Sequence, residues 1–295
     1  MPLIDAAGAK THIAQMNQGA EEAVILIHGL FTNLSVFYFA IAPRLARRFR
    51  VVMYDLRGHG MSEWRDGGYG LAALAGDLLG LMDALGIRKA GLAGYSYGGL
   101  VALSAALSCP ERVGALALID SPRISQRELD GVAAALGDAA AAEAAVEGHL
   151  RALGVLGAGM RGAGLGSRGA RGARQGGSFA GGAGDALGGR AARQAAESLV
   201  RLYGGGRLRD DMQADMGFLD EAQLGLLGRP ALLLYGRRSP NIGAGRDLAR
   251  RIPGALLKVG RGDHNLPVQS GAWVGRQLLR FYAAAGAGSG AGARN

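Results

Sequence analysis

Short apolar runs alternate with stretches of helical periodicity along most of this 295-residue chain. A run of four to eight apolar residues with little polar content is typical of a parallel strand that is covered on both faces. Six such runs lie at residues 23–27, 50–54, 90–93, 113–119, 231–235 and 255–259, and residues 1–20 predict one or two edge strands.

Helical patterns follow most of these runs, at residues 37–48, 71–85, 100–107, 243–251 and 271–283. In the first of them Pro43 lies where it can kink the helix. Strands that alternate with helices are typical of a parallel sheet wound with right-handed crossovers. The sequence therefore predicts the α/β class, with a mostly parallel central sheet and flanking helices.

The alternation of strands and helices stops after Pro122 and resumes at Pro230. Residues 157–189 contain 14 glycines in 33 positions, and glycine disfavours helix by about 1 kcal/mol per residue against alanine. We expect a helical, glycine-rich cap or lid over residues 123–228, inserted between core segments 1–122 and 229–284. The chain's last stretch, 285–295, is expected to be a disordered tail.

The amino-acid composition says little about which molecules this protein binds. The net charge of +9 comes almost entirely from arginine, and high Arg, Ala and Gly together indicate a coding bias rather than a nucleic-acid or membrane partner. The glycine-rich stretch carries arginines but only Phe179 as an aromatic platform for bases, although its arginines could attract an acidic or phosphate-bearing substrate. Cys109 is the only cysteine, which excludes an internal disulfide. No leader peptide or membrane span is predicted, so a cytoplasmic location is expected.

A serine between two glycines carries the most specific chemistry. Gly94-x-Ser96-x-Gly98 lies between a predicted strand and a predicted helix. A sharp turn there leaves no room for side chains at the glycines, exposes the serine hydroxyl, and directs the Tyr97 N–H toward a developing oxyanion. The chain has no phosphate-binding loop, metal-ligand spacing or dinucleotide fingerprint, so no cofactor and no metal are expected.

Four blocks in order resemble the α/β-hydrolase superfamily, in its serine-nucleophile branch with a cap: His28-Gly29, Asp55-x-Arg57-Gly58-x-Gly60-x-Ser62, Gly94-x-Ser96-x-Gly98-Gly99 and Gly262-Asp263-His264. The resemblance covers residues 20–125 and 229–283. It implies Ser96 as nucleophile and His264 as base, with the backbone N–H groups of Leu30 and Tyr97 (Phe31 being an alternative to Leu30) as the oxyanion hole. Ser96 argues against the members that use an aspartate nucleophile on halides or epoxides.

Four other histidines are assigned no catalytic role. The resemblance implies structural positions for His28 and His59, and His12 and His149 have no motif around them.

The acid of the triad is ambiguous. Most of the family carries it in the loop after the strand spelled 231–235, but that loop has no carboxylate and places Ser239 at the usual position. The main alternative is the loop after the preceding core strand, where Asp120 stands. Asp120 could instead cap a turn. Since a serine cannot be the acid, Asp120 is the candidate; Asp263 is expected to point away from its neighbour His264, and Asp247 lies within a helix.

The resulting hypothesis is a cofactor-free serine hydrolase of esters or thioesters, acting on a small acyl substrate, which could be carrier-linked. Phe31 and Tyr95, with Phe37, Tyr38 and Tyr97, could line an apolar acyl pocket or could simply pack the core. Two alternatives stay open: carbon–carbon bond hydrolysis or acyl transfer with the same triad, and a non-catalytic ligand-binding protein on this scaffold. The missing acid after residue 235 is the best support for the non-catalytic alternative.

Overall fold

The computed structural model describes residues 2–30, 32–122, 207–215 and 221–289. Most of the expected cap insertion, including the glycine-rich stretch and His149, therefore lies outside the described residues, as does Phe31.

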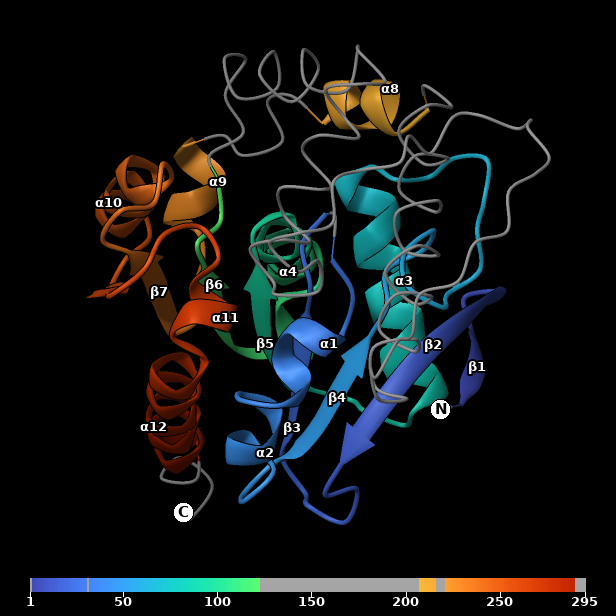
Figure 1. The fold of residues 1–295 in the computed structure, drawn as a ribbon, viewed down its shortest axis with the longest axis horizontal. Helices are drawn as coiled ribbons and strands as arrows, with labels where there is room; N and C mark the ends of the chain where they lie inside the picture. Colours follow the sequence, from blue (N-terminus) through green and yellow to red (C-terminus); the bar gives the residue numbers. More distant parts are fainter. Residues whose placement is uncertain (1, 31, 123–206, 216–220, 290–295) are drawn as a thin grey trace, which may run out of the picture.

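An eight-stranded sheet forms the centre of the molecule (Figure 1), in the order β1-β2-β4-β3-β5-β6-β7-β8. Its strands are β1 (Leu3–Ala6), β2 (Ala9–Met16), β3 (Ala23–Ile27), β4 (Arg50–Tyr54), β5 (Ala90–Tyr95), β6 (Val113–Ile119), β7 (Ala231–Gly236) and β8 (Leu256–Gly260). The pairs β1·β2 and β2·β4 are antiparallel, and every pair from β4 to β8 is parallel. The predicted α/β class with a mostly parallel sheet is confirmed.

Helices cover both faces of this sheet. One face carries α1 (Ser35–Tyr38), α2 (Ala42–Leu45), α11 (Leu266–Gln269) and α12 (Gly271–Ser289). The other carries α3 (Leu71–Ala84), α4 (Tyr97–Ser108) and α10 (Ile242–Arg251). Two described pieces of the expected insertion, α8 (Arg207–Ala214) and α9 (Glu221–Gly225), contribute Leu208 and Leu224 to the second face's core, and a short 3-10 helix covers Pro110–Arg112.

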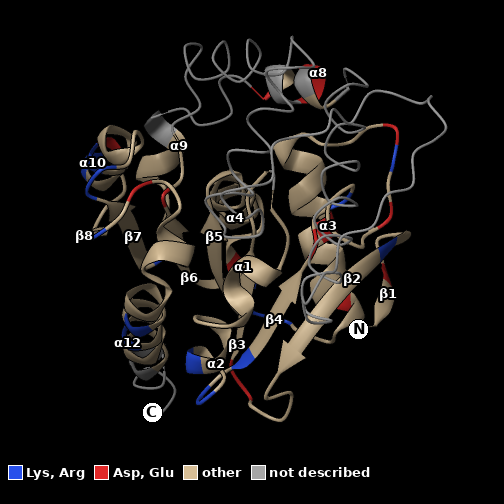
Figure 2. Ribbon diagram, in the orientation of Figure 1, with Lys and Arg blue, Asp and Glu red and all other residues tan. Residues whose placement is uncertain are grey.

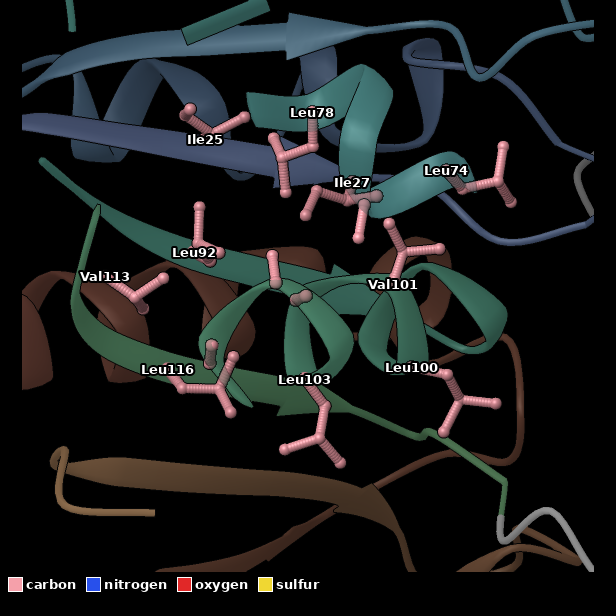
Figure 3. Packing of buried hydrophobic residues seen from close by; sticks show 14 of the residues in the cluster. Ile25, Ile27, Leu74, Leu78, Leu92, Leu100, Val101, Leu103, Val113 and Leu116 are labelled. Carbon is pink, nitrogen blue, oxygen red and sulfur yellow. The ribbon is translucent and has the colours of Figure 1, made fainter. Parts of the chain in front are cut away.

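The core follows the period-two pattern of the strands. Along β3, Val24 and Leu26 pack under α1, α2 and α12, while Ile25 and Ile27 pack under α3 and α4. Figure 3 shows the core on the face that carries α3 and α4, where Leu100, Val101 and Leu103 of α4 lie over β5 and β6. Because successive side chains of a strand point to opposite faces, a fully apolar strand fills both cores at once.

The predicted helix over 37–48 is wrong as a single element. The chain forms α1 and then α2, with Pro43 in the first turn of α2. Proline has no N–H for the preceding helical turn, so a new helix begins there instead of the old one continuing. The predicted tail also begins too early: α12 includes residues 285–289, and only 290–295 lie outside the described residues.

The strands β3, β5, β6 and β7 carry no charged residue, whereas β1, β2, β4 and β8 carry one each, Asp5, Lys10, Arg50 and Lys258 (Figure 2). Within the described residues, no helix combines the length and apolar character that crossing a membrane requires.

Candidate active site

Ser96 stands at the sharp turn between β5 and α4. Its backbone adopts φ 52° and ψ −123°, a region that costs a residue with a side chain about 1–3 kcal/mol. Hydrogen bonds on both sides hold the turn: the Ser96 N–H donates to Ile119 O at 2.9 Å, and the Gly99 N–H donates to Ser96 O at 2.9 Å. The strained serine is therefore fixed at the end of the strand, with its side chain half-buried.

The glycines around Ser96 are required by close backbone approaches. A Cβ at Gly94 would lie 2.1 Å from the carbonyl oxygen of Gly98, and a Cβ at Gly98 would lie 2.3 Å from the carbonyl oxygens of Ile27 and His28. No side chain fits at such distances. The glycine pattern of the sequence thus reports the packing of α4 directly against the ends of β3 and β5.

An aspartate–histidine pair lies at the carboxyl end of the sheet, the edge at which β5 ends in Ser96. Asp120 follows β6, has φ 49° and is fully buried. Its Oδ1 lies 3.2 Å from Nδ1 of His264, which follows β8 and is about one-third exposed. The structure therefore brings together the two residues that the sequence nominates as acid and base, across 144 positions of the chain.

The loop after β7 contributes further contacts to this pair. The Gly236 N–H donates to Asp120 Oδ2 at 2.9 Å, and the Ser239 hydroxyl donates to Asp120 Oδ1. The Asn241 side-chain amide donates to Asp120 O and lies 3.1 Å from His264 Nδ1. Sequence reasoning missed Gly236, Ser239 and Asn241 as partners of the acid. The sequence feature that could have identified them is their position just after a core strand, at the sheet edge where Asp120 also lies.

The loop after β3, which carries the candidate oxyanion donor Leu30, approaches Ser96 closely. A Cβ at Gly29 would lie 2.8 Å from Ser96 Cβ, so the backbone of this loop lies against the serine. His28 fixes it: Nδ1 donates to Gly29 O at 2.7 Å, while Nε2 accepts the Leu56 N–H at 2.9 Å. Burial lowers the pKa of His28, which keeps the ring neutral and lets Nε2 act as an acceptor. Phe31, the alternative donor, is outside the described residues.

A second buried carboxylate, that of Asp55, holds the segment that follows β3 through the N–H of Leu34. Asp55 accepts the N–H groups of Leu34 and Met61 and faces His12 Nδ1 at 2.6 Å. Burial works against ionisation of Asp55, but the hydrogen bonds from His12 and from the two backbone N–H donors outweigh it and hold its pKa below the usual value. His12, which the sequence left without a role, is therefore a structural partner of the Asp55 motif.

Tyr95 is a correction to the predicted pocket. Its side chain is only 1% exposed within the core under α12, and its ring centroid lies 5.4 Å from that of His264. The Tyr95 ring therefore packs against the His264 ring and is not available to line an open substrate pocket. Phe37 is also fully buried.

The carboxylate of Asp263 is turned away from His264, as expected. It accepts hydrogen bonds from the side-chain amide of Gln269, and these lower its pKa.

The described part of the expected insertion meets the core next to the nucleophile turn. Asp211 of α8 accepts the Tyr69 N–H at 2.8 Å, and Asp215 accepts the Leu71 N–H at 2.6 Å. The helix itself offers these N–H groups at the start of α3 no acceptor, so the two carboxylates supply one, although burial raises the pKa of Asp215. Tyr97, the residue after Ser96, is buried and donates its hydroxyl to Tyr69 O. Figure 1 shows α8 beyond this end of α3.

Comparison with known proteins identifies the family and the fold. The model of the alpha/beta hydrolase fold family matches residues 22–269. The chain belongs to this family. Among curated relatives, a 2-hydroxymuconate semialdehyde hydrolase of a Pseudomonas species is 34% identical over 137 residues, 45% of this chain and 48% of the relative. The acetyltransferase component of an acetoin cleaving system from Cupriavidus necator is 40% identical over 115 residues, 39% of this chain and 30% of the relative. The matches thus span half or less of these relatives.

Solved structures resemble the chain over nearly its whole length. The enol-lactonase of Burkholderia xenovorans aligns with a TM-score of 0.71 and 23% identity, over 96% of this chain and all of that one. A meta-cleavage product hydrolase of Pseudomonas fluorescens aligns with a TM-score of 0.71 and 21% identity, over 97% of this chain and 98% of that one. At this identity the likeness establishes the shared fold.

Proposed function

We propose that this chain is a serine hydrolase that cleaves an ester or thioester through an acyl-enzyme intermediate. The observation that carries the proposal is the 3.2 Å approach of Asp120 Oδ1 to His264 Nδ1, at the sheet edge where β5 ends in the strained Ser96. With Nδ1 engaged by the carboxylate, Nε2 of His264 is the nitrogen left to accept the serine proton.

The reaction follows from these roles. Ser96 Oγ attacks the acyl carbonyl carbon while its proton moves to His264 Nε2. The N–H groups of Leu30 and Tyr97 donate to the oxyanion that forms. As the intermediate collapses, the bond to the leaving alcohol or thiol breaks, and that group takes the proton from His264. Water then attacks the acyl-serine ester with the same base, which releases the acid and restores Ser96.

The insertion is proposed to cover this site as a cap. Its described helix α8 supports the idea, because Asp211 and Asp215 join it to the start of α3, next to Tyr97. Open α/β sheets bind ligands at the carboxyl ends of their strands, and a segment inserted after β6 leaves the sheet at that edge. Phe31 remains a proposed pocket residue on the loop after β3.

A second candidate reaction is favoured by the names of the relatives. The matches include hydrolases named for 2-hydroxy-6-oxo-2,4-heptadienoate and 2-hydroxymuconate semialdehyde, compounds that contain no ester. Hydrolysis of such a compound breaks a carbon–carbon bond next to a carbonyl. The acetyltransferase relative likewise favours a carrier-linked acyl group, or acyl transfer to an acceptor other than water.

A fluorophosphonate probe tests the proposal, because it reacts only with a serine whose proton a base can remove. The expected result is one adduct per chain, on Ser96 by peptide mass spectrometry, and none in His264→Ala. An unlabelled wild-type protein that is folded would favour the non-catalytic ligand-binding alternative. Turnover of esters, acyl thioesters, lactones and 2-hydroxy-6-oxodienoates by the untreated wild-type protein would then separate the two reactions.

A further inference from the structure

The loop between β7 and α10 places a serine where it contacts the candidate acid. Ser239 is 4% exposed and donates its hydroxyl to Asp120 Oδ1, the same oxygen that lies 3.2 Å from His264 Nδ1. Asp120 is fully buried, so water cannot replace these partners. The carboxylate therefore depends on protein donors for its orientation.

The direction of each hydrogen bond in the loop follows from what each group can donate. The Asn241 backbone N–H can only donate, and it donates to Ser239 Oγ at 3.0 Å. The single hydroxyl proton of Ser239 is then free for Asp120. On the other carboxylate oxygen, the Gly236 N–H donates to Asp120 Oδ2 at 2.9 Å. One donor on each oxygen fixes the carboxylate plane, which prevents it from turning away from His264.

We propose that Ser239 is a positioning residue, which holds the Asp120 carboxylate toward His264 in a chain whose acid stands after β6 instead of after β7. The inference rests on the proposed function, since it assigns Asp120 and His264 their roles in activating Ser96. It also has a structural corollary. Because Ser239 Oγ lies within hydrogen-bond reach of the oxygen that faces His264, a carboxylate at position 239 can take over the acid's place.

The first test measures the rate at which a fluorophosphonate labels Ser96 in hydroxyl variants. Ser239→Ala should slow labelling about tenfold, because a hydrogen bond to a charged group is lost. Ser239→Thr keeps the hydroxyl and should stay within about threefold of wild type. Ser121→Ala is the matched control. It removes a buried hydroxyl that has no hydrogen-bond partner among the described residues, and should leave the rate unchanged.

The second test moves the acid. Asp120→Asn should lower the labelling rate by about 10⁴, as in the best-measured triad. Asparagine suits this position because it tolerates the φ of 49° better than most residues. Adding Ser239→Asp to Asp120→Asn should recover at least tenfold of the lost rate. A merely structural role for Ser239 predicts no recovery, since the added carboxylate would then only disturb the loop.

The outcomes distinguish failure of the proposed hydrolase function from failure of the role proposed for Ser239. A wild-type protein that is not labelled at Ser96 overturns the proposed function and this inference with it. Normal wild-type labelling, together with a Ser239→Ala variant that is labelled as fast, overturns the inference alone. The same holds if Asp120→Asn is inactive and Ser239→Asp restores nothing while thermal unfolding shows that both variants are folded. Should Ser239→Ala fail to fold, the Ser239→Thr rate and the relocation test still decide.

Discussion

The serine end of the candidate site lies in one continuous segment, β5–Ser96–α4, whereas its acid–base end collects residues from three places in the chain. Ser96 is held by hydrogen bonds from its own turn and from β6, and by close backbone packing at Gly94 and Gly98. Asp120 and His264 are 144 positions apart and meet only because β6, β7 and β8 are adjacent parallel strands.

This difference teaches how each end can fail. The serine end depends on shape, because its glycines admit no other residue without moving a strand or a helix. The acid–base end depends on a hydrogen-bond network around a buried carboxylate, in which the donors can be exchanged while the backbone stays in place. Substitutions at the serine end should therefore cost stability or all activity, as should loss of the base His264, whereas those at Asp120 and its hydrogen-bond donors should cost activity by degrees.

The largest expected effect comes from removing the nucleophile or the base. Ser96→Ala and His264→Ala should each lower turnover by about 10⁶, the scale of comparable triads, with little change in thermal unfolding. The double variant should be scarcely slower than either single one, because the two groups act as a unit. Turnover of a generic ester by the four proteins checks this. Substantial activity in Ser96→Ala would exclude an acyl-serine intermediate.

The next effect tests whether loss of the candidate acid costs activity only by degrees. Asp120→Asn should reduce turnover by about 10⁴, two orders of magnitude less than loss of the serine. The amide keeps an acceptor for Ser239 or Gly236 but favours the imidazole tautomer that cannot take the serine proton. Steady-state kinetics with a generic ester measure the loss. Unchanged turnover would show that another group orients His264.

Substitution of Gly94 tests whether the serine end fails through steric overlap alone. Gly94→Ala puts a Cβ 2.1 Å from the carbonyl oxygen of Gly98 and should destabilise the fold by about 3 kcal/mol or more. Gly76→Ala is the control: this exposed position within α3 has nothing within 4 Å of an added Cβ, and the change should stabilise by up to about 1 kcal/mol. Urea unfolding measures both. Equal stabilities would mean that the turn is not rigid.

Mild acid tests the loops beside the serine end, where His28 holds the loop after β3 and the buried ring of His59 lies 5.3 Å from that of His28. Burial lowers the pKa of His59 to about 4 from an unfolded value near 6.5. Between those values the unfolded chain binds a proton that the folded protein does not, so stability falls as pH decreases from 6.5 to 4. The loss is about 3 kcal/mol for His59. Urea unfolding at several pH values should give a shallower dependence for His59→Gln; an equal slope would contradict the assignment.

Most of the sheet could be predicted from the sequence because its central strands are short, continuous apolar runs. A strand covered by helices on both faces buries every residue of such a run. Boundaries were less predictable where backbone chemistry competes with periodicity. At residues 37–48 the apolar pattern suits one helix, but Pro43 starts a second one. At the C-terminus the glycines suggested fraying, and α12 nevertheless continues past Gly286, next to Glu22.

The sequence by itself determined the family and the nucleophile turn, because a strained turn packed against two strands leaves a local signature of glycines that no distant residue can supply. It also narrowed the acid to Asp120 by eliminating the loop after β7. Only the tertiary structure decided what surrounds that carboxylate. Ser239, Gly236 and Asn241 contact Asp120 or His264 because parallel strands end at one edge of the sheet. The identity of a serine or an asparagine in a loop says nothing of which buried oxygen it will reach; strand order and register decide that.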